Sequence, residues 1–498
     1  MDSLTTFLLL SSILYTILLF LAPVWRQKKW KLPPGPSPVP IIGNFLQLGQ
    51  DPHRRLANLS KKYGPLMYLK LGSIHTIVAS SPETAREILQ KHDQTCSGRA
   101  VPHVAHSMDH HKASMAWLPV GPKWRELRKI CREHIFTLHK MEASEGLRQE
   151  KLQQLRDHLE SCCSTAKLVN FEEASFVVAL NLISATLFSA DFARFDSDSS
   201  LQDIKETVQG LMKIAGTPNL VDFFPVFRFL DPQNLSRRSK AYFATLLDQF
   251  DEIIGKRLQE RAKDSPRKRD LLEVLLDILN QENDSELSLH DVKHLLIDLF
   301  VAGTDTTTDS VQWAMTELLR NPEKMLKAKN ELTVVIGDDE QVRESDIPKL
   351  PYLNAVIKES FRLHPPGPFL IPHKAEADVD INGYTIPRGA RILVNVWAIG
   401  RDSNVWSNPD SFEPERFLDN KMGYRGQDFG LLPFSSGRRI CPGLPLAHLM
   451  VHLMVASMIH QFDWRLEPGM KPEDVDLNDV FGLSLHKAVP LKAYPIRS

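Results

Sequence analysis

Apolar residues recur with two different periods along this chain. From about Pro82 to Arg362 they mostly follow the spacing of one helix face. Residues 66–80 alternate instead, which predicts two strands with a turn near Gly72-Ser73. Strand signals return at 381–395, around the turn-forming pair Asn382-Gly383. Because no internal repeat or change of composition divides the chain, we expect one large domain that is mainly α with a minor β-sheet.

The first residues form an uncharged apolar run. No charge occurs from Ser3 to Trp25, and Phe7–Ala22 is almost wholly apolar, which can span about 30 Å of hydrocarbon. Four basic residues follow: Arg26, Lys28, Lys29 and Lys31. Residues 1–25 are therefore predicted to be a single-pass membrane anchor that leaves the rest of the chain in the cytosol. A cleaved signal peptide is the alternative, but the run lacks a basic n-region and a small-residue cleavage site.

Residues 26–40 join this anchor to the predicted domain at 41–498. The stretch LPPGPSPVP, residues 32–40, is rich in proline, which favours an extended and stiff backbone. Such a stretch can be a ligand for a proline-binding domain. Its place at the junction favours a rigid hinge between the membrane and the folded domain.

Charge and cysteine content exclude two classes of protein. Lys and Arg number 60 against 61 Asp and Glu, for a net charge of −1, so there is no electrostatic case for binding nucleic acid. The 5 cysteines are sparse and odd in number, which does not suggest a disulfide framework. A reducing compartment is expected.

The stretch FSSGRRICPG, residues 434–443, places a lone cysteine directly before a long apolar helix. Pro442 suits the first position of a helix, which makes Cys441 the predicted N-cap. The helix N-terminus, with Arg438 and Arg439 nearby, should favour loss of the thiol proton. Cys441 is therefore predicted to be a thiolate ligand or a nucleophile.

The neighbours of Cys441 distinguish between these chemistries. A zinc site would need partner ligands, and no Cys or His lies at suitable spacing around it. A nucleophile would need a base, which the sequence does not identify. A single thiolate facing an open position fits haem iron better. Gly437 and Gly443 agree, because glycine lets backbone N–H groups or a flat ligand approach.

Residues 291–320 have the apolar period of one long helix without proline. The middle contains poor helix formers, Gly303 and several threonines, whose hydroxyls can bond carbonyls of the preceding turn. Small residues followed by Asp305 and Thr306 predict a cleft with a proton relay. The alternative is a helix boundary with Asp305 as N-cap.

Two further charged patterns carry little information alone. Glu359 and Arg362 are three residues apart on one predicted helix face, and Arg416 lies in a loop beside an acidic residue. By themselves both would be solvated surface pairs.

Together these residues resemble the cytochrome P-450 superfamily of haem-thiolate monooxygenases. Its signature Phe-x-x-Gly-x-Arg-x-Cys-x-Gly is matched by Phe434, Gly437, Arg439, Cys441 and Gly443. Its long-helix motif is matched by Ala302, Gly303, Asp305, Thr306 and Thr307, its Glu-x-x-Arg pair by Glu359 and Arg362 with Arg416, and its Trp-x-x-x-Arg by Trp124 and Arg128. These motifs cover nearly the whole chain in the family's order.

More closely, the chain resembles the plant microsomal family seventy-six. The stretches that match include AWLPVGPKWRELRKI, DLFVAGTDTT, WAIGRD and LLPFSSGRRICPGLPLA. Members of that family mostly oxidise terpenoids, namely monoterpenols, sesquiterpenes and labdane- or abietane-type diterpenes. Another branch hydroxylates tyrosine.

The resemblance implies a role for each matching residue. Cys441 is the implied axial thiolate ligand of haem b, in a loop shaped by Phe434, Gly437 and Gly443. The implied propionate contacts are Trp124, Arg128, His373 and Arg439. Thr306 and Asp305 are implied to help deliver protons to dioxygen, and Glu359, Arg362 and Arg416 to brace the cysteine loop. His373 departs from its relatives, which commonly carry Arg there, so its contact would be weaker and pH-dependent.

The resemblance also implies partners and a location. No G-x-G-x-x-G fingerprint or flavin domain occurs in the chain. Electrons from NADPH must therefore come from a separate NADPH-cytochrome P-450 reductase, with O2 as co-substrate. The expected location is the endoplasmic reticulum membrane, with the catalytic domain, residues 41–498, in the cytosol.

The implied substrate pocket draws on residues 100–118, 366–370 and 482–485 and on the middle of the long helix. Its expected lining is mainly apolar: Val301, Ala302, Phe369, Leu370 and Leu483. Such walls suit a terpenoid, a small hydrophobic substrate, whereas the charges of tyrosine would need buried partners. Asp298 is the exception, because it could bind a substrate amine or merely face the helix bundle.

Three other functions stay open at this point. One is a hydroxylase of an aromatic substrate such as tyrosine. The others are a haem-thiolate enzyme that rearranges its substrate without O2, and a non-catalytic haem- or ligand-binding membrane protein. The intact Asp305–Thr306 pair argues against these last two, for which a proton relay would be superfluous.

Overall fold

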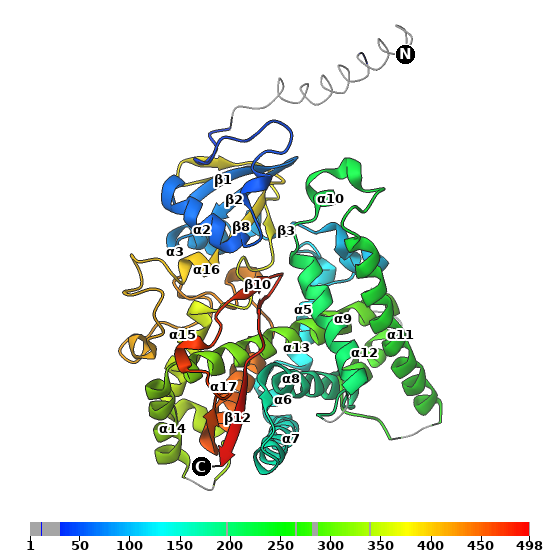
Figure 1. Ribbon diagram of the computed structural model, residues 1–498. Coiled ribbons are helices and arrows are strands. Elements are labelled where there is room, and N and C mark those ends of the chain that lie inside the picture. The colour runs from blue at the N-terminus through cyan, green and yellow to red at the C-terminus, as the bar shows by residue number, and fades with distance from the viewer. Residues whose placement is uncertain are drawn as a thin grey trace, which may run out of the picture.

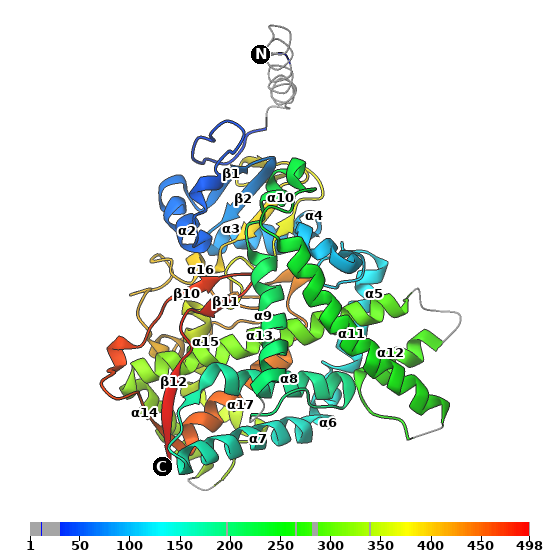
Figure 2. The same ribbon diagram turned by 45° about the vertical axis from the view of Figure 1, so that its right-hand side comes forward.

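The computed structural model describes residues 11, 30–195, 198–263, 266–280, 287–337 and 340–497. Apart from Ser11, the predicted membrane anchor at 1–25 lies outside the described residues. The described chain is mainly helical with small sheets, as predicted, and Figures 1 and 2 show the helices gathered beside and below a sheet at one end.

The helices form most of the body. Those before the long central helix are α2 (Pro52–Tyr63), α3 (Pro82–Arg86), α4 (Asp93–Cys96), α5 (Pro122–His134), α6 (Leu138–Ala143), α7 (Glu145–Ser164), α8 (Phe171–Phe188), α9 (Asp198–Gly216), α10 (Leu220–Phe223), α11 (Leu235–Ala262) and α12 (Leu271–Asn280). The others are α13 (Leu289–Arg320), α14 (Pro322–Ile336), α15 (Pro351–Leu363), α16 (Val396–Ile399) and α17 (Leu444–His460).

The largest sheet has the strand order β1-β2-β8-β5-β3. Its strands are β1 (Leu66–Leu71), β2 (Ile74–Ala79), β3 (Gly98–Arg99), β5 (His373–Lys374) and β8 (Arg391–Val394). Smaller sheets join β6 (Val379–Ile381) to β7 (Tyr384–Ile386), β10 (Asp479–Phe481) to β11 (Leu485–Lys487), and β4 (Val169–Asn170) to β12 (Lys492–Arg497) and β9 (Phe462–Arg465). The predicted strand pair is β1–β2, and the predicted hairpin turn at Asn382-Gly383, both with positive φ, joins β6 to β7.

The long helix α13 crosses the middle of the molecule in both views (Figures 1 and 2). Ser288 caps it in a capping box with Asp291, and the helix runs without a break to Arg320. Asp305 lies in its interior, so the alternative of a helix boundary at this residue is wrong. α13 packs on α8, α15 and α17, and most of its side chains are buried.

One other helix has the composition of a membrane span. Among the described residues, only α8 is long and apolar enough to cross a bilayer, and 72% of it is buried inside the protein. Because it packs against α13, it is a core helix of the domain.

The inner part of the predicted hinge lies on the sheet. The backbone N–H of Tyr68 in β1 donates to the Pro34 carbonyl at 2.9 Å, and Asn44 donates to the Pro36 carbonyl. A side chain at Gly35 would collide with the Tyr68 carbonyl, at 1.9 Å. Residues 33–37 are therefore held against the folded domain.

A buried ion pair joins α15 to the loop that follows α16. Arg362 donates to both carboxylate oxygens of Glu359 at 2.7 Å, and Arg416 donates to the same carboxylate at 3.0 Å. Arg362 also donates to the carbonyls of Gly400, Pro409 and Ser411. These bonds tie the 400–416 segment to α15. The same helix contacts the cysteine loop through Phe361, whose ring centroid lies 5.4 Å from that of Phe434.

Glu359→Ala should strongly destabilise the domain, because it leaves the buried guanidinium of Arg362 without a carboxylate. We expect a loss of about 3–5 kcal/mol in the free energy of unfolding, measured by denaturant titration. Glu413→Ala is the matched control, since Glu413 also pairs with Arg416 but its side chain is 37% exposed. Its expected cost is below about 1 kcal/mol. Equal losses in the two variants would contradict a special role for Glu359.

Candidate functional site

A cavity of about 370 Å³ lies between the middle of α13 and the start of α17. Its lining includes most of the residues that the sequence analysis singled out: Trp124, Arg128, Asp298, Val301, Ala302, Thr306, Leu370, Phe434, Arg439, Cys441, Gly443 and Leu483. Gly437, Asp305, His373 and Phe369 do not line it. The spacing motifs thus converge on one enclosed space.

Cys441 precedes α17 instead of capping it. The helix begins at Leu444 with Gly443 as its N-cap, two residues later than predicted. The backbone N–H groups of Gly443 and Leu444 nevertheless hydrogen-bond to the sulfur. The helix terminus therefore acts on Cys441 through N–H groups, although Cys441 is outside the helix.

The electrostatics at Cys441 differ from the expectation. Burial raises the pKa of the thiol above its usual value, although the two N–H groups and Arg128 lower it. Arg438 pairs with Asp93 at 3.1 Å and is 46% exposed, so it is not the cation expected beside the sulfur. The protonated thiol is thus the favoured form unless a cation binds the sulfur directly.

The two glycines of the cysteine loop have different reasons to be glycine. Gly437 has φ +66°, and a Cβ there would lie 2.1 Å from the Leu89 carbonyl oxygen. Gly443 has an ordinary φ of −79°, and its Cβ would lie 3.8 Å from the Cys441 sulfur. The prediction that both leave room around the sulfur is therefore wrong for Gly437, which makes room for the backbone at Leu89.

Two arginines lie over Trp124 at one side of the cavity, and a third, Arg99, lies close enough for their charges to act on it. Arg128 and Arg439 hold their guanidinium groups 5.5 and 4.8 Å from its ring centroid. Arg128 donates to the Ile440 carbonyl, Arg439 to those of Ser97 and Leu118, and Arg99 to those of Ala116 and Ile371. Within the described part of the chain, none of the three forms an ion pair, and Nη1 of Arg439 is buried without a partner.

This cluster carries uncompensated positive charge. Burial lowers the pKa of Arg99 well below its usual value, and the neighbouring Arg439 and Arg128 lower it further. Arg99 was missed by the sequence analysis, because it matches none of the motifs used. Its strand β3 pairs with β5, which carries His373 at the register position opposite Arg99.

His373 lies deeper than expected. Its Nδ1 donates to the Cys96 carbonyl at 2.8 Å, and its Nε2 is buried without a partner. Burial and the charge of Arg99 lower the pKa of His373 well below its usual value. The imidazole is therefore neutral here, and its free nitrogen is an acceptor that cannot donate to a carboxylate without taking up a proton.

These groups fit a haem. A half-buried thiol, three arginines of which Arg99 and Arg439 are buried, and an orphaned Nη1 call for a ligand with a cation at one place and carboxylates at another. A haem provides both, with its iron and its propionates. The described residues that could hold the propionates are Arg99, Arg128 and Arg439, together with Trp124.

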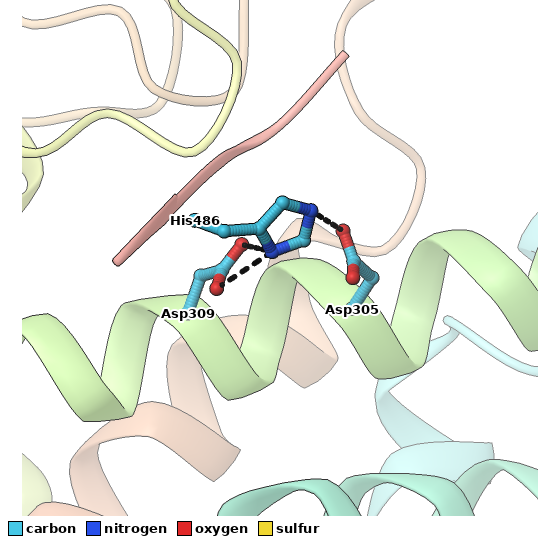
Figure 3. Close-up of side chains that lie close together, drawn as sticks. All are labelled: Asp305, Asp309 and His486. Atoms are coloured by element: carbon cyan, nitrogen blue, oxygen red, sulfur yellow. Dashed lines mark hydrogen bonds and ion pairs between the residues drawn. The ribbon is translucent and has the colours of Figure 1, made fainter. Parts of the chain in front are cut away.

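On α13 the predicted relay is divided between two faces. Thr306 lines the cavity, and its hydroxyl donates to the Ala302 carbonyl at 2.7 Å. Asp305 lies on the other side, 1% exposed, where it accepts a hydrogen bond of 2.5 Å from Ser484. Figure 3 shows its carboxylate facing His486 together with that of Asp309.

Among the described residues that line the cavity, Asp298 is the one carboxylate, and its oxygens are already occupied. Ser114 Oγ lies 2.8 and 3.0 Å from the two oxygens, and Nε2 of His110 lies 3.3 Å away. Asp298 thus fixes the loop before α5 against α13.

Phe369 packs away from the main cavity, contrary to the prediction. Its ring lies 5.8 Å from that of Phe481, beside a second cavity of about 80 Å³.

Comparison with known proteins agrees with this geometry. A family model described as "Cytochrome P450" matches residues 33–490. The chain is 54% identical over 471 residues to "Cytochrome P450 76T24" of Catharanthus roseus, covering 94% of both chains. It is 49% identical over 472 residues to "Ferruginol synthase" of Salvia miltiorrhiza, covering 94% of this chain and 95% of the relative. It is also 48% identical to "Sugiol synthase" of the same species over 492 residues, covering 98% and 99%.

The two loop glycines should respond differently to alanine. Gly437→Ala should cost about 1–3 kcal/mol for the strained backbone, and more if the Leu89 backbone cannot shift. Gly443→Ala should stay within about 0.5 kcal/mol, because its Cβ meets only ordinary contacts. Thermal unfolding of the two variants tests this, and a Gly443→Ala loss as large as that of Gly437→Ala would contradict it.

Proposed function

Because the chain belongs to the cytochrome P450 family, whose members are monooxygenases, we propose that it oxidises a terpenoid in the cavity beside Cys441. Mono-, sesqui- and diterpenes are the candidate skeletons, abietane-type diterpenes among them. The overall reaction converts substrate RH, O2, two electrons and two protons into ROH and water. One observation carries the proposal: a mainly apolar cavity encloses both Cys441 and the face of α13 that bears Thr306.

The family implies a haem with thiolate ligation, and this proposal assigns the ligand to Cys441. When bound, the haem supplies the activation of dioxygen. The N–H groups of Gly443 and Leu444 would stabilise the negative charge on the sulfur. Arg99, Arg128 and Arg439 would neutralise the propionates and gain the carboxylate partners that they lack.

The α13 residues position substrate and protons. Ala302 and Gly303 line the cavity with little or no side chain, which leaves space for a substrate beside α13. A Cβ at Gly303 would lie 2.8 Å from the Ile183 side chain of α8. The Thr306 hydroxyl, freed from the Ala302 carbonyl, can donate to an oxygen in the cavity. A bound apolar substrate would displace water from this mainly apolar space.

The cavity wall favours a terpenoid over a charged substrate. Val301, Ala302, Leu370 and Leu483 all line it. Two relatives carry the names of diterpenoid synthases, ferruginol synthase and sugiol synthase. Together these observations support a polycyclic hydrocarbon skeleton with few polar groups.

Tyrosine is the weaker alternative. Its ammonium group would need a buried anion, and Asp298 would have to give up bonds to Ser114 and His110 to provide it.

Members of the family generally use a redox partner. We propose that an NADPH-dependent reductase on the endoplasmic reticulum membrane supplies the electrons to this chain.

Cys441→Ser should abolish the strongly red-shifted absorption of the reduced, carbon-monoxide-bound protein. Serine keeps the shape of the side chain but removes the thiolate ligand. Cys163→Ser, at a half-buried cysteine of α7, is the control and should keep the full spectrum. An unchanged spectrum in folded Cys441→Ser protein would rule out this ligand.

Abietane-type diterpenes should convert the haem from low spin to high spin when titrated into the oxidised protein. The physical reason is that an apolar skeleton displaces water from an apolar cavity. Tyrosine should leave the spectrum unchanged at the same concentrations. A spin shift and turnover with tyrosine alone, and none with any terpenoid, would refute the substrate class.

A further inference from the structure

A buried acid cluster lies on the face of α13 that is turned away from the cavity. Asp305 and Asp309 are one helical turn apart, and the imidazole of His486, in β11, lies between them (Figure 3). Its Nδ1 is 3.1 Å from Asp309, and its Nε2 is 3.8 Å from Asp305. Both carboxyl groups are 1% exposed, so the cluster is shielded from water.

The cluster can hold one exchangeable proton near neutral pH. Burial opposes charge on the imidazole, but the carboxylates of Asp305 and Asp309 outweigh it and raise the pKa of His486 to about 10. Burial raises the pKa of Asp309 to about 7, despite the charge of His486. Burial also raises the pKa of Asp305. An imidazolium with two carboxyl groups therefore gains or loses one proton in the neutral range.

Other charged groups near the cluster already have partners. Glu172 of α8 faces it and pairs with Lys205 of α9 at 2.7 Å. Lys487, next to His486 in β11, lies over the ring of Trp313. The negative charge of Glu172 still raises the pKa values of His486, Asp305 and Asp309.

A metal ion does not explain this arrangement. The two ring nitrogens of His486 point in opposite directions, each toward a different carboxylate (Figure 3). One ligand atom of each residue lies within 4.8 Å of the others, but both ring nitrogens are directed at carboxylates, which is the arrangement of an ion-paired imidazolium. The imidazolium itself supplies the positive charge between them.

Ser484 connects the cluster to the cavity. It is one of the cavity-lining residues, and its Oγ lies 2.5 Å from Asp305 and 3.2 Å from Nε2 of His486. We propose that His486, Asp305 and Asp309 store a proton for the cavity and that the Ser484 hydroxyl passes it on. In this scheme His486 passes the proton from Asp309 to Ser484, because its Nδ1 faces Asp309 and its Nε2 faces Ser484.

The transfer is balanced at each atom. The proton of the Asp309 carboxyl moves to Nδ1 of His486 while the proton on Nε2 moves to Ser484 Oγ, and the hydroxyl proton of Ser484 moves to an oxygen acceptor in the cavity. The cluster is left with one more negative charge and takes a proton back through His486, whose side chain is 13% exposed. The inference rests on the proposed reaction, which consumes two protons per turnover.

The first test measures the stored proton directly, without turnover. Infrared titration of the full-length, haem-loaded protein should show a carboxylic acid band with a midpoint near pH 7. The band should be lost in Asp309→Asn and should persist to higher pH in His486→Gln, which lacks the imidazolium. Absence of any such band across the neutral range would overturn the proposal, whatever the substrate is.

The second test measures the use of the proton. In Ser484→Ala, product formed per NADPH should fall by about tenfold and hydrogen peroxide should rise, with the infrared band retained. Ser484→Thr, which restores the hydroxyl, should recover most of the product. Full coupling in Ser484→Ala would overturn the relay.

His364→Gln is the matched control. His364 is also a buried histidine paired with a carboxylate of α13, Glu317, at 2.6 Å, but it does not line the cavity. It should lower thermal stability and leave product per NADPH and its pH profile unchanged. An equal loss of product per NADPH in this control would mean that the effects at Ser484 and His486 come from general instability, and it would overturn the proposal. If no terpenoid is oxidised while the infrared band behaves as expected, the proposed substrate fails and the proton store stands.

Discussion

The protein buries positive charge that its own described residues do not neutralise. Arg99, Arg128 and Arg439 converge near Trp124 without a carboxylate partner, and their carbonyl acceptors satisfy hydrogen bonds but not charge. The cysteine loop, α5 and the β3–β5 pair all meet around this cluster. An anionic ligand that reaches the arginines and a cation at Cys441 would therefore stabilise the whole region, which couples haem binding to folding.

The second constraint is α13, which separates two chemical environments. On one face, its middle presents Thr306 and Ala302 to an apolar cavity. On another face, it presents Asp305 and Asp309 to His486. Because a helix repeats every 3.6 residues, adjacent residues necessarily point in different directions. The neighbouring acid and hydroxyl of the motif thus do not share one cleft. Among the described residues, Ser484 lines the cavity and also contacts Asp305.

Local sequence carried much of the prediction. The bounds of α13, the β1–β2 pair and the turn at Asn382-Gly383 follow from periodicity and turn residues, which act over a few positions. The start of α17 was displaced by two residues, because the chain at Cys441 is held by Phe434 and Arg128 before the helix begins. The proline-rich stretch packs on β1, a contact that its composition does not reveal.

By itself the sequence determined the family, the long central helix and the cysteine loop, since these depend on residue types at fixed short spacing. Only the tertiary structure decided where charge is buried. Arg99, Ser484 and His486 acquire their roles from partners far away in the chain, and no local pattern marks them. The ionisation of Cys441 and His373 likewise departs from the sequence expectation. The physical reason is that a pKa depends on desolvation and on neighbouring charges, and both are fixed only when the elements pack.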